Sequence, residues 1–404
     1  MWDGSSKTDN NINQTNKSMK LSKLLFVSLL ALPFTACDSN SDEPDNKNDL
    51  SAKELVLKSA TEDYISHTVR PTYEAMADAA IKMCDLCHTM QEKHEAGTLA
   101  EADIKAAGEA WKLARKNWEL SEAFLFGPAA NHNIDPHIDS WPLDKAAMEN
   151  LLTQIRNGNR WTLDNNGGYG LIGFHAVEYM LFQLSEDENT SMVHSADYTP
   201  EEMEYLVAVA DDLCQQCVCL EACWSGTENV SAEKQEILDD AELDYNENYG
   251  WEMMNAGQAG SRFKTYQEAA EEIIQGCIDI ADEVGNTKIG RPHMGSSLED
   301  KNYIESPYSL NSIEDFVDNI KSVRNAYLGS RSGDKSVSDY VKSVNASVDE
   351  EVRTAIDNAI EAIGKIPEPF AKSATGALSE AAMEAAGSDL VDALEKAMSV
   401  VTGR

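Results

Sequence analysis

Two polar side chains, His175 and Glu178, stand three residues apart in the mostly apolar run GYGLIGFHAVEYMLF (168–182). Residues i and i+3 of an α-helix share one face, so a helix here would aim the imidazole and the carboxylate at one place. A mixed nitrogen and oxygen donor set suits iron, zinc or manganese. Two donors alone hold a metal poorly, so further ligands must come from elsewhere in the chain. The alternative is a hydrogen-bonded pair with a purely structural role.

Two glutamates are candidates to complete such a site, Glu122 and then Glu305. Glu122 precedes the apolar run AFLF, and a buried carboxylate without a partner is costly. Arg115 could pair with Glu122 instead, and Glu305, in ESPYS, could instead make a helix cap or loop contact. Asp135 and Asp139 could add oxygens, although such residues more often form Asx turns.

Signatures of other catalytic sites are absent from the sequence. It contains no HExxH pair, no GxSxG nucleophile turn and no phosphate-binding loop. Three histidines stand in loops that could approach the site, and we expect all three to be surface residues: His132, His137 and His293. We expect the remaining four at the surface as well: His67, His88, His94 and His194.

The charge balance excludes one class of partner. Among 404 residues, 70 are acidic and 33 are basic, which gives a formal net charge of −37. Such a surface repels nucleic acid and anionic lipid, so we expect no nucleic-acid partner. It attracts cations only weakly and without specificity, and the acidity is better explained by solubility.

The N-terminal region predicts export. From Met19 the chain reads MKLSKLLFVSLLALPFTAC, with two lysines, an apolar stretch and small residues before Cys37. This pattern resembles a bacterial lipoprotein signal, in which the cysteine after the cleavage site carries the lipid. We therefore expect residues 1–37 to be an upstream segment plus signal peptide, with translation starting at Met19. Plain secretion with cleavage nearby is the alternative.

Lipidation at Cys37 predicts a membrane location. The polar, acidic residues 38–53 read as a flexible tether. Acidic residues directly after the cysteine resemble export tags of surface lipoproteins. We expect a bacterial cell-envelope protein, lipid-anchored to the outer membrane and either periplasmic or surface-exposed.

Seven further cysteines allow two interpretations. Two CxxC pairs, at 84–87 and 214–217, stand within apolar helical patterns instead of knuckle-like turns. A four-cysteine zinc site is one interpretation. Buried free thiols, with at most one helix-to-helix disulfide, are the other, which we favour.

Helical spacing of apolar residues dominates the chain beyond residue 50, with almost no strand pattern. The expected helices cover 51–96 with a kink or break at Pro71, 101–126, 144–156, a stretch from about 170, 199–224, 261–284, 311–327, 337–363 and 380–401. We expect loops at 127–142 and 285–309, and a polar linker at 225–250. The sequence thus predicts an all-α fold of two helical-bundle domains, at 54–240 and 241–404.

Several segments resemble the imelysin family. GFHAVEYMLF (173–182) resembles its GxHxxE signature. The other matching segments, in the family's order, are YISHTVRPTYEAMA (64–77), AWKLARKNWELSEAFLFGP (110–128), IDPHIDSWPLD (134–144), QGCIDIADEVGNTKIGRP (275–292) and ESPYSLNSIEDFVDNIKSVRNAYLG (305–329). The resemblance covers about residues 55–400, although the cysteine-rich segment 214–223 is not a feature of the family.

The resemblance implies two bundles related by pseudo-symmetry, with a site where they meet around His175 and Glu178. It also implies an exported bacterial protein linked to iron acquisition. We therefore expect iron or an iron-bearing ligand, with zinc as the alternative metal, and other envelope iron-uptake proteins as partners. The family carries a metallopeptidase label, so an HxxE peptidase is the alternative function. A pure interaction module, whose motif residues lock the bundles together, is a third.

Overall fold

The computed structural model describes residues 50–159, 163 and 168–404, and within them the chain is mainly helical. The signal peptide, Cys37 and nearly all of the tether lie outside these residues. None of the helices described is both long enough and apolar enough to cross a membrane.

The helices before residue 240 include two of 26 residues, α2 and α9. In chain order the elements are α1 (Ala52–Asp63), η1 (Tyr64–Val69), α2 (Arg70–Glu95), α3 (Glu101–Glu119), η2 (Glu122–Phe124), α4 (Pro128–Asn131), α5 (Ile134–Ile138), α6 (Lys145–Arg156), η3 (Tyr169–Leu171), α8 (Gly173–Leu181), α9 (Pro200–Ser225), η4 (Thr227–Asn229) and α10 (Ala232–Ala241). Between α8 and α9 a short antiparallel hairpin pairs β1 (Phe182–Leu184) with β2 (Ser191–Val193).

The later elements are again helical. They are α11 (Tyr249–Met254), α12 (Tyr266–Asp282), η5 (Glu283–Ile289), α13 (Gly290–Met294), α14 (Leu298–Lys301), α15 (Ser312–Leu328), α16 (Val337–Val344), α17 (Ala346–Ile363), α18 (Phe370–Ser373), α19 (Ala377–Glu384), η6 (Ala385–Leu390) and α20 (Val391–Thr402). Three segments, η1, η5 and η6, are π-helical and continue directly into α-helices.

Local sequence explains where the main helices start. At α9, the Thr199 side chain accepts from the Glu202 N–H while Glu202 accepts from the Thr199 N–H, and Pro200 fills the first turn. Asn345 caps α17 by accepting from the Val348 N–H. We expected a single helix over 337–363, and that prediction was wrong at Asn345, where this cap divides the segment into α16 and α17.

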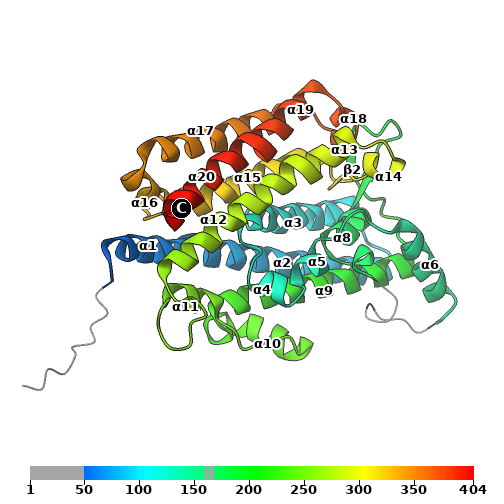
Figure 1. Cartoon of the computed structure of the whole chain (residues 1–404). Coiled ribbons are helices and arrows are strands. Elements are labelled where there is room, and N and C mark those ends of the chain that lie inside the picture. The colour runs from blue at the N-terminus through cyan, green and yellow to red at the C-terminus, as the bar shows by residue number, and fades with distance from the viewer. Residues whose placement is uncertain (1–49, 160–162, 164–167) are drawn as a thin grey trace, which may run out of the picture. The chain divides into compact units, whose positions relative to one another are not determined.

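Two groups of helices pack together (Figure 1). In one, α2 contacts both α3 and α9. In the other, α12 contacts α15 and α20, α17 contacts the same two helices, and α15 also contacts α3. Buried side chains from both groups form one continuous core. Residues 50–404 cluster as one unit, and the division at 240/241, like the pseudo-symmetry, stays a prediction.

Three expected irregular segments contain helices. The linker 225–250 contains α10, the loop 285–309 contains most of η5 together with α13 and α14, and the loop 127–142 contains α4 and α5. Conversely, the helix expected over 101–126 ends at Glu119, and a 3-10 turn follows. Polar composition hid these elements because they are short and carry no long periodic apolar stripe.

Candidate functional site

The helix α8 carries the GFHAVE segment, and its first residue explains the glycine of that motif. Gly173 has a φ of +76°, a conformation that disfavours side chains. A Cβ atom here would stand 2.2 Å from the carbonyl oxygen of Ile138. The glycine therefore lets the start of α8 abut the end of α5, and this contact brings His175 to Asp139.

The His175 ring lies between two carboxylates and is 3% exposed. Its Nε2 atom is 3.0 Å from Oδ1 of Asp139, and its Nδ1 atom is 3.1 Å from Oε2 of Glu178. Burial opposes protonation of the ring, but the bonds to Asp139 and Glu178 outweigh it and raise the His175 pKa to about 9. In the metal-free protein at neutral pH, the ring is therefore an imidazolium that donates from Nδ1 to Glu178 and forms an ion pair with Asp139 through Nε2.

The Glu178 carboxylate is fully engaged by neighbours. Oε2 faces His175, while Oε1 accepts from the N–H groups of Tyr308 (3.0 Å) and Ser309 (2.8 Å) and from the Ser309 hydroxyl (2.7 Å). The i,i+3 pair does point to one place, as its spacing predicts. In addition, Glu178 ties the 302–310 loop to α8, a role that spacing alone could not reveal.

Arg115, on α3, is the centre of a buried ion cluster. Its guanidinium contacts four carboxylates, which are Glu119 (2.6 Å), Asp139 (2.7 Å), Glu305 and Asp315 (3.2 Å). Arg115 and Glu119 are i,i+4 neighbours, whereas the other three carboxylates come from distant segments. Attraction to Arg115, together with the bond to His175, outweighs burial and holds the Asp139 pKa well below its usual range.

Lys288, in the π-helical segment η5, is the second buried cation. Its ammonium group lies 3.1 Å from Glu305, 3.6 Å from Glu122 and 3.7 Å from Glu119. Glu122 thus pairs with Lys288 and not with Arg115, the partner that we had considered. Glu305 contacts both cations, so it is part of an ion cluster instead of a simple helix cap.

The buried cluster has more acid than base. Six buried carboxylates surround Arg115, Lys288 and His175: Glu119, Glu122, Asp139, Glu178, Glu305 and Asp315. Burial raises the pKa of Glu305 to about 7, and it raises the pKa values of Glu122 and Asp315 well above their usual range. These carboxyl groups therefore hold protons near neutral pH unless another cation takes their place.

Three donors of this cluster have a metal-site arrangement. Ligand atoms of Asp139, His175 and Glu305 all lie within 4.8 Å of one another, and a second set within the same limit joins Glu119 and Glu122 to Asp139. The Oε2 atom of Glu305 is buried and accepts no hydrogen bond within the described chain. An unpartnered carboxylate oxygen beside an imidazole is the chemistry that a metal ion would satisfy.

A pocket of about 390 Å³ opens beside His175 and Glu178. Residues from both sides of position 240 line it: Trp141, Pro142, Leu143, Lys145, His175, Glu178, Leu184, Glu188, Asn302, Ile304, Pro307, Tyr308, Leu310, Pro369, Ala371 and Lys372. The Lys288 ammonium lies 5.2 Å from the ring centre of Trp141, so the ion cluster adjoins the pocket through that ring. Glu122 and Glu305 belong to the ion cluster and are not part of the pocket lining.

The three loop histidines do not reach the site. His132 pairs with Glu247 (2.9 Å), His137 with Asp212 (2.9 Å), and His293 Nδ1 bonds the Ala374 carbonyl oxygen (2.8 Å). These histidines lie in or next to the short helices α4, α5 and α13, and each is bonded to a partner outside the His175 site. Lys288 is the main group that the sequence did not indicate, because its segment reads as a loop. The lysine in GNTKIGRP, within a family-like segment, was the only available signal.

Comparisons with known proteins identify relatives. Residues 69–401 match the family model described as Imelysin. Iron-regulated protein A of Synechococcus elongatus is 26% identical over 322 residues, which cover 78% of each chain.

Solved structures share the fold. The structure from Parabacteroides distasonis described as an iron-regulated protein A precursor aligns with a TM-score of 0.72 at 25% identity, and the match covers 87% of this chain and 97% of that one. An imelysin-like protein from Psychrobacter arcticus aligns with a TM-score of 0.56 at 14% identity, covering 87% and 94%.

Proposed function

Because the chain belongs to the imelysin family, we propose that it is an exported lipoprotein that binds iron, or a small iron-bearing ligand, beside His175. The proposal includes a place in iron acquisition, with other envelope proteins as partners. A relative named Iron-regulated protein A supports the link to iron.

One observation carries the metal assignment, namely the donor set of Asp139, His175 and Glu305 with its unpartnered Glu305 oxygen. Carboxylate oxygens with one imidazole suit iron better than a thiolate set would. In this proposal these three side chains contact the metal. Glu178 accepts from Nδ1 and orients the ring, as carboxylates behind ligating histidines do. Glu122, held by Lys288, is a further oxygen at the edge of the set.

The pocket supports a ligand larger than a bare ion. Its volume of about 390 Å³ lies within the range of small-molecule sites. Lys145 and Lys372 contribute positive charge to its lining, while Trp141 and Tyr308 contribute aromatic faces. Glu178 and Glu188 add negative charge to the same lining, so it suits an iron complex that carries both polar and aromatic groups.

Metal analysis of the purified protein tests the assignment. Prepared without chelator, the protein is expected to carry iron near one equivalent, and His175→Ala and Glu305→Gln are expected to lose it. His94→Ala is the matched control, since His94 bonds the Tyr198 carbonyl oxygen on a different part of the surface. Absence of metal, together with no affinity for ferrous or ferric ions on titration, would reject the proposal in favour of a pure interaction module.

A peptidase assay distinguishes the iron-binding proposal from the alternative function, a metallopeptidase. Zinc in place of iron, with chelator-sensitive cleavage that disappears in His175→Ala, would establish a metallopeptidase. Our proposal expects iron-dependent stabilisation against heat and no cleavage of peptides.

The anchor is tested separately. Cys37→Ser is expected to move the protein from the membrane fraction to the soluble fraction of the envelope, because the acyl chains proposed at Cys37 are lost. A variant that stays with the membrane would contradict lipid anchoring at Cys37 and leave the metal assignment untouched.

A further inference from the structure

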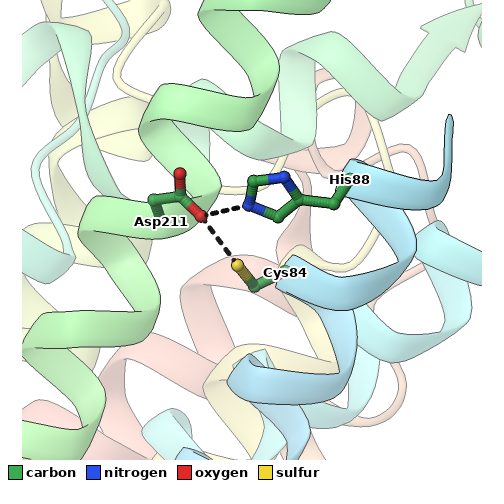
Figure 2. Close-up of side chains that lie close together, drawn as sticks. All are labelled: Cys84, His88 and Asp211. Atoms are coloured by element: carbon green, nitrogen blue, oxygen red, sulfur yellow. Dashed lines mark hydrogen bonds and ion pairs between the residues drawn. The ribbon is translucent and has the colours of Figure 1, made fainter. Parts of the chain in front are cut away.

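A second cluster of side chains of metal-ligating types lies between α2 and α9 (Figure 2). On α2, Cys84 and His88 are one turn apart. On α9, Asp211 faces both, with its Oδ1 atom 2.9 Å from the Cys84 sulfur and 2.7 Å from Nε2 of His88. All three ligand atoms lie within 4.8 Å of one another.

A fourth donor, Cys214, stands one turn after Asp211 on α9. Cys84 and Cys214 line the same pocket of about 320 Å³, although Cys214 is not a member of the set whose ligand atoms lie within 4.8 Å of one another. Cys84 and Cys214 come from different CxxC pairs; Cys214 is buried, as are the partners Cys87 and Cys217, which do not line this pocket. The two pairs therefore do not gather into one four-cysteine site. The structure instead brings together one cysteine from each pair with a histidine and an aspartate.

We propose that Cys84, His88, Asp211 and Cys214 form a binding site for Zn²⁺ or a similar thiophilic divalent cation. Four-coordinate sites with sulfur, imidazole nitrogen and carboxylate oxygen are typical of zinc. On binding, the Cys84 and Cys214 thiols lose their protons to solvent and the imidazole binds as the neutral ring. Four more carboxylates line the pocket and strengthen its attraction for cations: Asp85, Glu233, Glu236 and Asp240.

Cys84, His88 and Asp211 need only small movements to accept the ion, whereas the Cys214 side chain must turn toward them. Ligand atoms around tetrahedral zinc stand about 3.3 to 3.8 Å apart, farther than the present Asp211 contacts. The side chains of His88 and Asp211 are 50% and 38% exposed, so both can shift outward by that amount. Their helices are the longest described and pack directly on each other, which fixes the backbone around the site.

The test uses metal titration of the reduced, chelator-treated protein. Co²⁺ is expected to produce thiolate-to-cobalt charge-transfer absorption, and Zn²⁺ is expected to displace it at one equivalent. Cys84→Ser, His88→Asn and Asp211→Asn are each expected to weaken Zn²⁺ binding at least 10-fold, measured by competition with a chromophoric chelator. Circular dichroism melting of each variant checks that it has folded.

Two controls make the result specific. His94→Asn changes another histidine of α2, and Cys277→Ala removes a buried thiol of α12; neither is expected to alter the cobalt spectrum. His175→Ala is also expected to retain the cobalt spectrum. Failure of the zinc proposal can therefore be distinguished from failure of the iron assignment at His175. A cobalt spectrum without thiolate bands would overturn the proposal. A Cys84–Cys214 disulfide found by mass spectrometry in the exported protein would also overturn it, because the two thiolate ligands would be lost.

Discussion

Asp139 and His175 meet at 3.0 Å between Oδ1 and Nε2, and the same oxygen of Asp139 lies 2.7 Å from the Arg115 guanidinium. One carboxylate thus joins the motif helix α8 to the ion cluster around Arg115. Trp118 Nε1–H donates to the other oxygen, Oδ2, at 2.8 Å. The position of His175 therefore depends on residues far from its own motif.

Removing Arg115 should destabilise the protein severely. Arg115→Met leaves Glu119, Asp139 and Glu305 with one cation fewer, and breaking a buried ion network costs about 3–5 kcal/mol. Urea unfolding near neutral pH should show this loss, and acidification should reduce it because the carboxylates take up protons. Lys116→Met, on the exposed neighbour, should change stability little. Equal stability of the two variants would contradict a structural role for the cluster.

Glu178→Gln should weaken metal binding without unfolding the protein. The amide oxygen can still accept from Tyr308 and Ser309, but its NH₂ group would meet Nδ1 of His175 instead of an acceptor. Loss of an orienting carboxylate typically costs 10–100-fold in metal affinity. Iron titration measures this change, and a histidine resonance followed by NMR should show a lower His175 pKa. An unchanged affinity would mean that Glu178 only secures the loop.

Gly173→Ala should both strain α8 and move His175. The positive φ disfavours alanine, and the new methyl group would overlap the Ile138 carbonyl oxygen. We expect a loss of about 2 kcal/mol or more in thermal unfolding, together with weaker iron binding. Gly168→Ala is the matched control, because its φ is −94° and nothing lies within 4 Å of the added atom. A Gly173→Ala protein as stable as this control would disprove the close-approach role.

Stability of the chelator-treated protein should fall on the alkaline side. The folded His175 pKa is raised from 6.5 to about 9, so its contribution is fully present below pH 6.5 and is lost as pH rises through 9. The shift corresponds to roughly 3 kcal/mol at most. Urea midpoints between pH 6 and 9.5 measure the slope, and His175→Asn should flatten this window. A slope unchanged in that variant would mean that another group causes the effect. Glu305 contributes a separate loss of stability, because its folded pKa is raised from 4.5 to about 7 and stability falls as pH rises through that window.

Sequence periodicity predicted the long helices because each carries an apolar stripe. It also predicted that His175 and Glu178 share a face, which one helical turn dictates. Asp139 and Glu305 could be named as candidates, but their meeting depends on long-range packing that spacing does not encode. Lys288 was missed because η5 combines glycine, asparagine and threonine, which read as a loop. Gly285 of η5 stands close to Gly387 of η6, and both segments are π-helical. The sequence of η5 alone gives no indication of this contact between two distant segments.

The contrast between the oxygen-rich donors at α8 and the sulfur-containing donors between α2 and α9 has a consequence for selectivity. Hard ferric ions prefer carboxylates, whereas borderline zinc competes best where thiolates are present. The two proposed sites would then bind different metals from a mixture according to chemical hardness. Excess zinc would occupy the site between α2 and α9 before it competed with iron beside His175.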